Sequence, residues 1–236
     1  MNSSVLTFVR EELSQNADEL TRNSAQRFFK EKVKFHGVKS AIVKKIAKKY
    51  YLTIKDCEKP EVFSLCEDLL KSNYSEEAFI AFEWCYTLRK SYEPDNFLVF
   101  EKWISDYVDN WAKCDTLCNH TLGSFIERYP EHIKNLKEWA RSDNRWVRRA
   151  SAVTLILPAR KGAFLEEVFE ISNILLKDKD DMVQKGYGWL LKEASKKHQE
   201  EVFGYIMTRK DEMPRTALRY SIEKMPQDLR KKAMEK

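Results

Sequence analysis

Apolar residues recur along this 236-residue chain at the three- and four-residue spacing of amphipathic helices. Residues 5–16 form the first such segment and residues 18–32 the second. Gly37 then interrupts the pattern, and Ser40 is the expected cap of a helix over residues 41–51. No segment alternates as a strand does, so the pattern predicts an all-α protein. The remaining helices are expected at residues 60–70, 78–88, 94–108, 130–139, 144–158, 164–177, 183–196, 200–208 and 215–224.

One short motif recurs at a nearly fixed period. Its central copy is Asp143–Ala150, and related stretches lie at residues 109–115 and 180–186, with a weaker copy at 216–220. Trp111 precedes Trp146 by 35 residues, and Val183 follows Val147 by 36. A period of this length without strands is typical of stacked helix pairs, each covering the apolar face of the next. The chain is therefore predicted to be a curved α-solenoid of antiparallel helix pairs.

The repeat pattern favours one elongated domain over residues 1–236. Within it we expect N-terminal helices over residues 1–55, repeats over residues 56–228, and a frayed tail at residues 229–236. The chain carries 42 Lys and Arg against 37 Asp and Glu, a modest net charge of +5. Lysines lie on both sides of the loop at residues 36–40, which predicts either a solvated face or an edge that contacts phosphates.

The chain shows no sign of secretion or membrane insertion. Its N-terminus lacks a basic segment followed by a long apolar run, and no window approaches the roughly 20 apolar residues of a spanning helix. Five cysteines, an odd number scattered through a large chain, favour reduced thiols. We expect a monomeric cytoplasmic protein that does not bind membranes and is nucleoid-associated if bacterial.

Cations occupy equivalent positions in successive copies of the motif. Arg149 aligns with Lys185, and Arg219 follows in the weaker copy. If the second helix of each pair lines the concave side, these residues form a ladder suited to a duplex phosphate backbone. Arg148 adds positive charge to the same region. Alternatively, Asp143 could pair with neighbouring arginines and link the repeats.

Four residues of the flanking copies can converge on one concave patch. Trp111 and Asp115 lie one turn apart on a helix, and Lys185 and Trp189 have the same spacing. Two aromatic rings, a carboxylate and the cation of Arg149 would then face the groove and suit a positively charged ligand group beside phosphates. A tryptophan at helical spacing also occurs commonly in a core, so packing is the alternative.

Other kinds of site are poorly supported. Cys114, Cys118 and His120 could be drawn as a zinc cluster, but no fourth ligand is evident. There is no Ser/His/Asp arrangement and no glycine-rich phosphate loop. We therefore expect neither a metal nor a cofactor.

Three motifs in order resemble those of the AlkD-like alkylpurine DNA glycosylases, a HEAT-like repeat family. They are Asn110-Trp111-x-x-x-Asp115, Ser142-Asp143-Asn144-x-Trp146-Val147-x-Arg149-Ala150 and Val183-Gln184-Lys185-Gly186-x-Gly188-Trp189-x-Leu191-x-Glu193. The resemblance runs from the first helix to about Pro226. It implies a curved all-helical solenoid of HEAT-like pairs that grips double-stranded DNA in its concave face.

The resemblance also implies an activity and roles for named residues. The family excises positively charged alkylated purines such as N3-methyladenine and N7-methylguanine without drawing the base into a pocket. By resemblance, Asp115 is the catalytic carboxylate, Trp111 and Trp189 are the walls against the deoxyribose, and Arg149 contacts the DNA backbone. A cationic base leaves as a neutral molecule, so one ionised carboxylate suffices to stabilise an oxocarbenium-like sugar and orient water.

Two departures from the family pattern concern the third motif and the loop at residues 37–40. Gly186 and Tyr187 replace a common Ala-Ile, which is expected to loosen the helix. The loop, with Lys39 and Ser40, resembles a turn that probes the strand opposite the lesion, but Lys39 replaces a neutral polar residue. The alternative function is a non-catalytic HEAT-like protein that binds DNA or a protein partner on its concave face.

Overall fold

The computed structural model describes residues 2–235, and over that range the chain is a solenoid of helices joined by short turns. In this part of the chain the one extended pairing is an isolated bridge between Lys34 and Tyr74. The all-α solenoid predicted from the repeat pattern is confirmed.

Sixteen α-helices, two short 3₁₀ helices and one π-helical turn make up the described residues. The α-helices are α1 (Asn2–Gln15), α2 (Glu19–Gln26), α3 (Ser40–Ile54), α4 (Lys59–Leu70), α5 (Ser75–Thr87), α6 (Asn96–Tyr107), α7 (Trp111–Thr116), α8 (Gly123–Arg128), α9 (Ile133–Trp139), α10 (Arg145–Val153), α11 (Ile156–Arg160), α12 (Leu165–Ile174), α13 (Asp181–Ala194), α14 (Gln199–Arg209), α15 (Arg215–Ser221) and α16 (Gln227–Met234). The 3₁₀ helices are η1 (Arg89–Ser91) and η3 (Pro130–His132), and the π turn is η2 (Leu117–Leu122).

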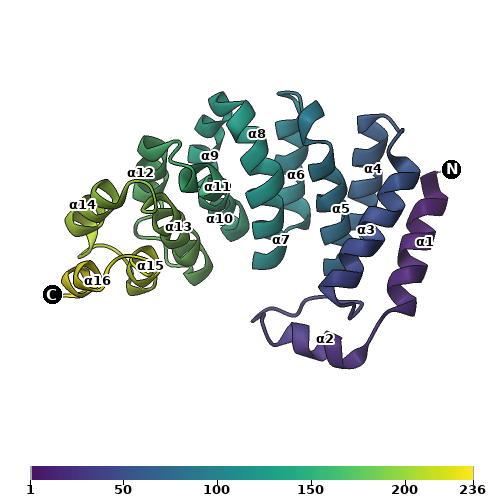
Figure 1. Cartoon of the computed structure of the whole chain (residues 1–236), viewed down its shortest axis with the longest axis horizontal. Coiled ribbons are helices and arrows are strands. Elements are labelled where there is room, and N and C mark those ends of the chain that lie inside the picture. The colour runs from purple at the N-terminus through teal and green to yellow at the C-terminus, as the bar shows by residue number, and fades with distance from the viewer. Residues whose placement is uncertain (1, 236) are drawn as a thin grey trace.

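The helices form two layers that curve together (Figure 1). Helices α3, α5, α7, α10, α13 and α15 pack in sequence as an inner row, and helices such as α4, α9 and α12 cover them from outside. The buried apolar side chains form one cluster that runs from Val5 to Ala233. Helix α2 stands apart and lies across the ends of the inner helices at the N-terminal half (Figure 1).

The recurring sequence motif marks the starts of three inner helices. Asn110 caps α7 by accepting hydrogen bonds from the backbone N–H groups of Ala112 and Lys113. Asn144 and Asp180 cap α10 and α13 in the same way. A side-chain oxygen at this position satisfies N–H groups that the first helical turn leaves without partners. The period of the sequence therefore reflects a repeated capping signal followed by a buried apolar face.

Two buried glutamates at the start of α5 anchor the N-terminal loop. Glu76 accepts hydrogen bonds from the backbone N–H groups of His36, Gly37 and Val38, at 3.0, 2.8 and 3.1 Å. Glu77 is bound by Arg10 at 2.9 Å and by His36 at 3.0 Å. Although burial opposes it, hydrogen bonds from His36 and Arg10 hold the pKa of Glu77 below its usual value. The two carboxylates thus join α1, the loop and α5.

The structure corrects three local predictions. The helix expected over residues 18–32 ends at Gln26, whose side chain bonds to the backbone of Glu31 and Val33. Ser40 is the first residue of α3 and does not cap it, since the capping position belongs to Lys39. Of the tail expected to fray, residues 229–234 belong to α16, which packs against α14 and buries Ala233, and Lys236 lies outside the described residues.

Five cysteines are free thiols, four of them buried. Cys114 and Cys118 lie in the core, whereas His120 is exposed beside the ring of Tyr86. Among residues 2–235 no three His, Cys, Asp or Glu side chains are arranged to hold a metal ion. None of the described helices is long and apolar enough to cross a membrane.

Replacing Glu76 should destabilise the protein strongly. Glu76→Ala leaves three N–H groups, two of them buried, without an acceptor, at a cost of about 3 kcal/mol or more in the free energy of unfolding. Glu83→Ala, on an exposed position of the same helix, should cost less than about 0.5 kcal/mol. Urea denaturation of both variants measures the difference, and equal losses would show that the loop does not depend on Glu76.

Candidate functional site

The site predicted from the sequence lies on the inner row of helices, where a pocket of about 300 Å³ opens between α7, α10, α13 and α15. Trp111 and Trp189 contribute aromatic walls, and Arg149 and Lys185 contribute cations. Trp111, Arg149 and Trp189, from three copies of the motif, therefore meet at one pocket, whereas Asp115 is not among its lining residues. The pocket is lined by Phe28, Lys30, Glu31, Trp111, Arg149, Met182, Lys185, Trp189 and Tyr220.

Arg149 lies at the inner wall of this pocket and is almost completely buried, with 4% of its surface exposed. Its Nε and Nη2 donate to the two carboxylate oxygens of Asp115 at 2.9 and 2.8 Å. A further N–H of the guanidinium donates to the backbone carbonyl of Met182. One side chain from α10 thereby binds α7 on one side and the start of α13 on the other.

Asp115 sits behind Arg149, with 16% of its side chain exposed. Burial raises the pKa of the Asp115 carboxyl above its ordinary value, and the guanidinium of Arg149 opposes this rise. In the described chain Arg149 is the one side-chain donor to this carboxylate, so each oxygen keeps a lone pair free. An oriented carboxylate with spare acceptor capacity can bind a water or face a developing positive charge.

The two tryptophans are held from opposite ends of the pocket. The Trp111 ring stacks on Phe29, with centroids 5.2 Å apart, and its Nε1 donates to the carbonyl of Phe28 at 3.3 Å. Trp189 Nε1 donates to Glu193 at 3.3 Å, and Arg160 binds Glu193 in turn. Neither indole belongs to the fully buried core, because each keeps a partly exposed face on the pocket.

Two glycines of α13 let neighbouring elements approach the site closely. A Cβ atom on Gly188 would lie 2.7 Å from Tyr220 Cβ, and one on Gly186 would lie 3.3 Å from Arg149 Cγ. Contrary to the expected loosening, α13 runs without interruption from Asp181 to Ala194. The glycines serve close packing against α15 and Arg149.

A segment between α2 and the Lys34 bridge crosses to the far side of the pocket. We name residues 27–33 the strap. Lys30 binds Asp181 at 2.8 Å, and Glu31 binds Arg145 at 3.2 Å. These ion pairs join the N-terminal region to α10 and α13. The strap therefore forms one wall of the pocket, a feature that the sequence analysis missed.

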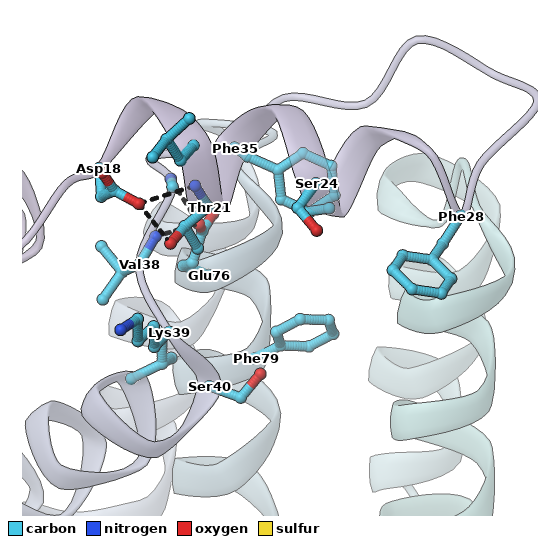
Figure 2. Close-up of a pocket in the computed structure, with 14 residues that line it drawn as sticks. Asp18, Thr21, Ser24, Phe28, Phe35, Val38, Lys39, Ser40, Glu76 and Phe79 are labelled. Atoms are coloured by element: carbon cyan, nitrogen blue, oxygen red, sulfur yellow. Dashed lines mark hydrogen bonds between the residues drawn. The ribbon is translucent and has the colours of Figure 1, made fainter.

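Phe28, at the base of the strap, lines both the site and a second, larger pocket of about 620 Å³, which Figure 2 shows. Its side chain is 73% exposed and faces Phe79 across the opening. The predicted DNA-contacting residues Lys39 and Ser40 line this second pocket at the start of α3. They lie beside the site but not in it.

The predicted cation ladder is present only in part. Lys185 lines the site and pairs with Asp181 at 3.2 Å. Arg148 Nε lies 2.6 Å from the Asp178 carboxylate, so it joins α10 to the turn before α13. This agrees with the alternative in which Arg148 links the repeats, although its partner is Asp178 and not Asp143. Arg149 was expected to face the DNA backbone, but its donors hold Asp115. Arg219 lies away from the pocket, on an exposed face of α15.

A π-helical turn directly after α7 was also missed. It spans Leu117–Leu122 and joins α7 to α8 as a widened stretch of one helix. Such turns are frequent at functional sites. Neither hydrophobic spacing nor any residue of this segment signals the widened turn.

Comparison with known proteins agrees with this architecture. The family model for DNA alkylation repair enzymes matches residues 9–225. Among solved structures, a predicted DNA alkylation repair enzyme from Enterococcus faecalis superposes with a TM-score of 0.81 at 14% sequence identity, over 90% of this chain and 98% of that one. No curated protein matches the chain by sequence.

Removing the Arg149 side chain should destabilise the protein much more than removing another cation of the pocket. Arg149→Ala leaves the buried Asp115 carboxylate unpaired and should lower the free energy of unfolding by about 3 to 5 kcal/mol. Lys185→Ala, which breaks a more exposed pair, should cost less than about 1 kcal/mol. Chemical denaturation compares the two, and similar small losses would mean that the Asp115 pair does not join the helices.

Proposed function

Since the chain belongs to the DNA alkylation repair enzyme family, we propose that it is a monofunctional DNA glycosylase for positively charged alkylated purines. N3-methyladenine and N7-methylguanine in duplex DNA are the proposed substrates. One observation carries the proposal. Trp111 and Trp189 line a pocket whose inner wall is Arg149, and Arg149 holds the Asp115 carboxylate behind it.

The proposed reaction needs little more than this carboxylate. An alkylated purine that already carries a positive charge leaves as a neutral base when its bond to the sugar breaks. No general acid is then required, and the positive charge passes to an oxocarbenium-like deoxyribose. The ionised Asp115 stabilises that charge and orients the water whose oxygen adds to the sugar carbon, with one proton released to solvent.

The aromatic walls complement the same charge. Indole faces attract cations, most strongly where water is excluded. Trp111 and Trp189 therefore suit a deoxyribose that becomes positive in the transition state. Arg149 acts as a positioning residue that keeps Asp115 oriented. Lys185, at the pocket, and Lys39 and Ser40, beside it, are proposed contacts for DNA phosphates.

The pocket also fits excision without insertion of the base. Aromatic rings and charged groups make up most of its wall, and none of its lining residues is an Asn or Gln that could read a base edge. We propose that the sugar faces the pocket while the base stays at its mouth. The positive charge of the lesion, and the weak bond that accompanies it, would then select the substrate.

A non-catalytic role on the concave face is the second candidate, and the strap favours it. Lys30, Arg145 and Lys185 are all paired with carboxylates around the pocket. Those pairs reduce the positive charge that would attract phosphates. This candidate predicts duplex binding without release of any base.

Asp115→Asn should abolish base release and leave duplex binding in place. We expect the single-turnover rate on DNA containing N7-methylguanine to fall at least about 100-fold. Asp143→Asn, an exposed position in the neighbouring motif, removes the same charge and should keep the rate. Circular dichroism verifies the fold of both variants.

Two outcomes would contradict the proposal in different ways. An unchanged rate in Asp115→Asn would remove this carboxylate from the mechanism. Duplex binding by the unsubstituted protein without base release would favour the non-catalytic candidate.

The rate should also fall at low pH. Because burial raises the pKa of Asp115, the carboxylate becomes protonated at a pH above the ordinary Asp value of about 3.9. The ionised form acts, so release is full above the raised pKa and declines as pH falls through it. Rates between about pH 4.5 and 8, corrected for spontaneous release, test this. A profile that stays flat down to the lowest pH at which the protein remains folded would contradict the role of Asp115.

A further inference from the structure

A basic groove lies beyond the last repeat, between α15 and α16. It encloses about 670 Å³ and is lined by Arg215 and Arg219 from α15 and by Arg230 and Lys231 from α16. The two helices lie side by side at the C-terminal end of the solenoid (Figure 1). Residues 229–234 of α16 were expected to be frayed, so no sequence pattern placed them beside Arg219.

These four cations differ from most of those near the site, because in the described chain none of them forms an ion pair at contact distance. Arg145, Arg148 and Arg149 all bind carboxylates of neighbouring elements. In the described chain no carboxylate pairs with any of the four cations of the groove, and all four are exposed. The one acid that lines the groove, Glu223, binds Lys192 at 2.9 Å, which lowers the pKa of Glu223, and the charge of Arg230 adds to that lowering.

Clustered like charges repel one another, and a fold that pairs most of its other arginines leaves these free. The cluster therefore fits an anionic partner that supplies the missing charge. Ile222 and Met234 are the apolar lining residues, and no aromatic ring is present on which a base could stack. The groove thus suits a phosphate backbone better than unpaired bases.

The groove lies next to the candidate site along α15. Arg219 directly precedes Tyr220, which lines the site pocket. Lys192 of α13 lies 5.7 Å from the Tyr220 ring and also binds Glu223. At about 1.5 Å per residue, the positions of Arg215 and Tyr220 are only some 7.5 Å apart along the helix axis. A duplex at the site would extend toward the groove.

We propose that the groove between α15 and α16 binds the sugar–phosphate backbone of the same duplex, to one side of the lesion, and extends the contact past the last repeat. The inference rests on the proposed binding of duplex DNA but not on base release. The groove contributes to the affinity of the protein for the duplex and to the register of the duplex on the protein. It does not contribute to the chemical step, because its cations do not line the site pocket.

The double variant Arg230→Gln/Lys231→Gln tests this. Both side chains are exposed and lack pairing partners, so the fold should persist, as a thermal melt would verify. Lys134→Gln/Lys197→Gln is the matched control, since it removes two exposed cations outside the groove. The probe is a duplex of about 25 base pairs with an uncleavable abasic analogue at its centre, which makes binding measurable whether or not the protein releases bases.

We expect the Arg230/Lys231 variant to lower the slope of log affinity against log salt concentration by about 1 to 2, and the control to leave it unchanged. Hydroxyl-radical footprinting should show that the protected stretch shortens at one end only. Single-turnover base release at saturating protein should stay the same.

An unchanged slope and an unchanged footprint in the Arg230/Lys231 variant would overturn the proposal. An acidic protein segment would then be the better candidate partner for the groove. Equal effects in the control would show general charge attraction and overturn it too. If the unsubstituted protein binds the duplex and the groove variant shortens the footprint, but no base is released, the proposed function fails and this inference stands.

Discussion

The guanidinium of Arg149 is the interaction on which the inner row of helices depends. It extends from α10 to the Asp115 carboxylate of α7 and to the Met182 carbonyl at the start of α13. A buried carboxylate without that partner would be strongly unfavourable, and a buried guanidinium without Asp115 equally so. The pair thus holds three successive repeats in one relative arrangement. It also fixes the relative placement of Trp111 and Trp189, which belong to the two outer members of that trio.

The strap adds a connection that a solenoid does not ordinarily have. In stacked repeats each unit contacts only its neighbours, and stability is roughly the sum of local terms. Here Lys30 reaches Asp181, 151 residues further along the chain. The contact partly closes the crescent across its concave side, with Phe28 and Phe29 placed against Trp111. Access of a duplex to the site and the position of the strap are therefore linked.

Much of this arrangement followed from residue patterns. The capping residues Asn110, Asn144 and Asp180 repeat with the motif, so the register of the inner helices could be read directly. That register places Trp111, Arg149 and Trp189 around one pocket. The local signal was strong because capping and helical spacing both act within a few residues.

The remainder depends on contacts that are distant in sequence. Residues 27–32 continue a helical pattern, yet Phe29 leaves it to stack on Trp111. Arg149 was predicted to be an unpaired cation, because its partner Asp115 lies 34 residues away in the sequence. Likewise, no local feature of residues 227–234 reveals that Ala233 has a place in the core. Tertiary packing decides such positions, and a single sequence does not display it.

The π turn at Leu117–Leu122 gives the site an unusual dependence on the length of the chain. A π turn corresponds to one extra residue accommodated within an α-helix, so a deletion in this stretch could be absorbed by ordinary α-helical winding. If the extra residue were instead wound into a regular α-helix, the segment before it would rotate by about 100° relative to α8. Asp115 would leave Arg149 although both residues were still present. The length of this stretch and its π-helical winding together therefore keep Asp115 against Arg149.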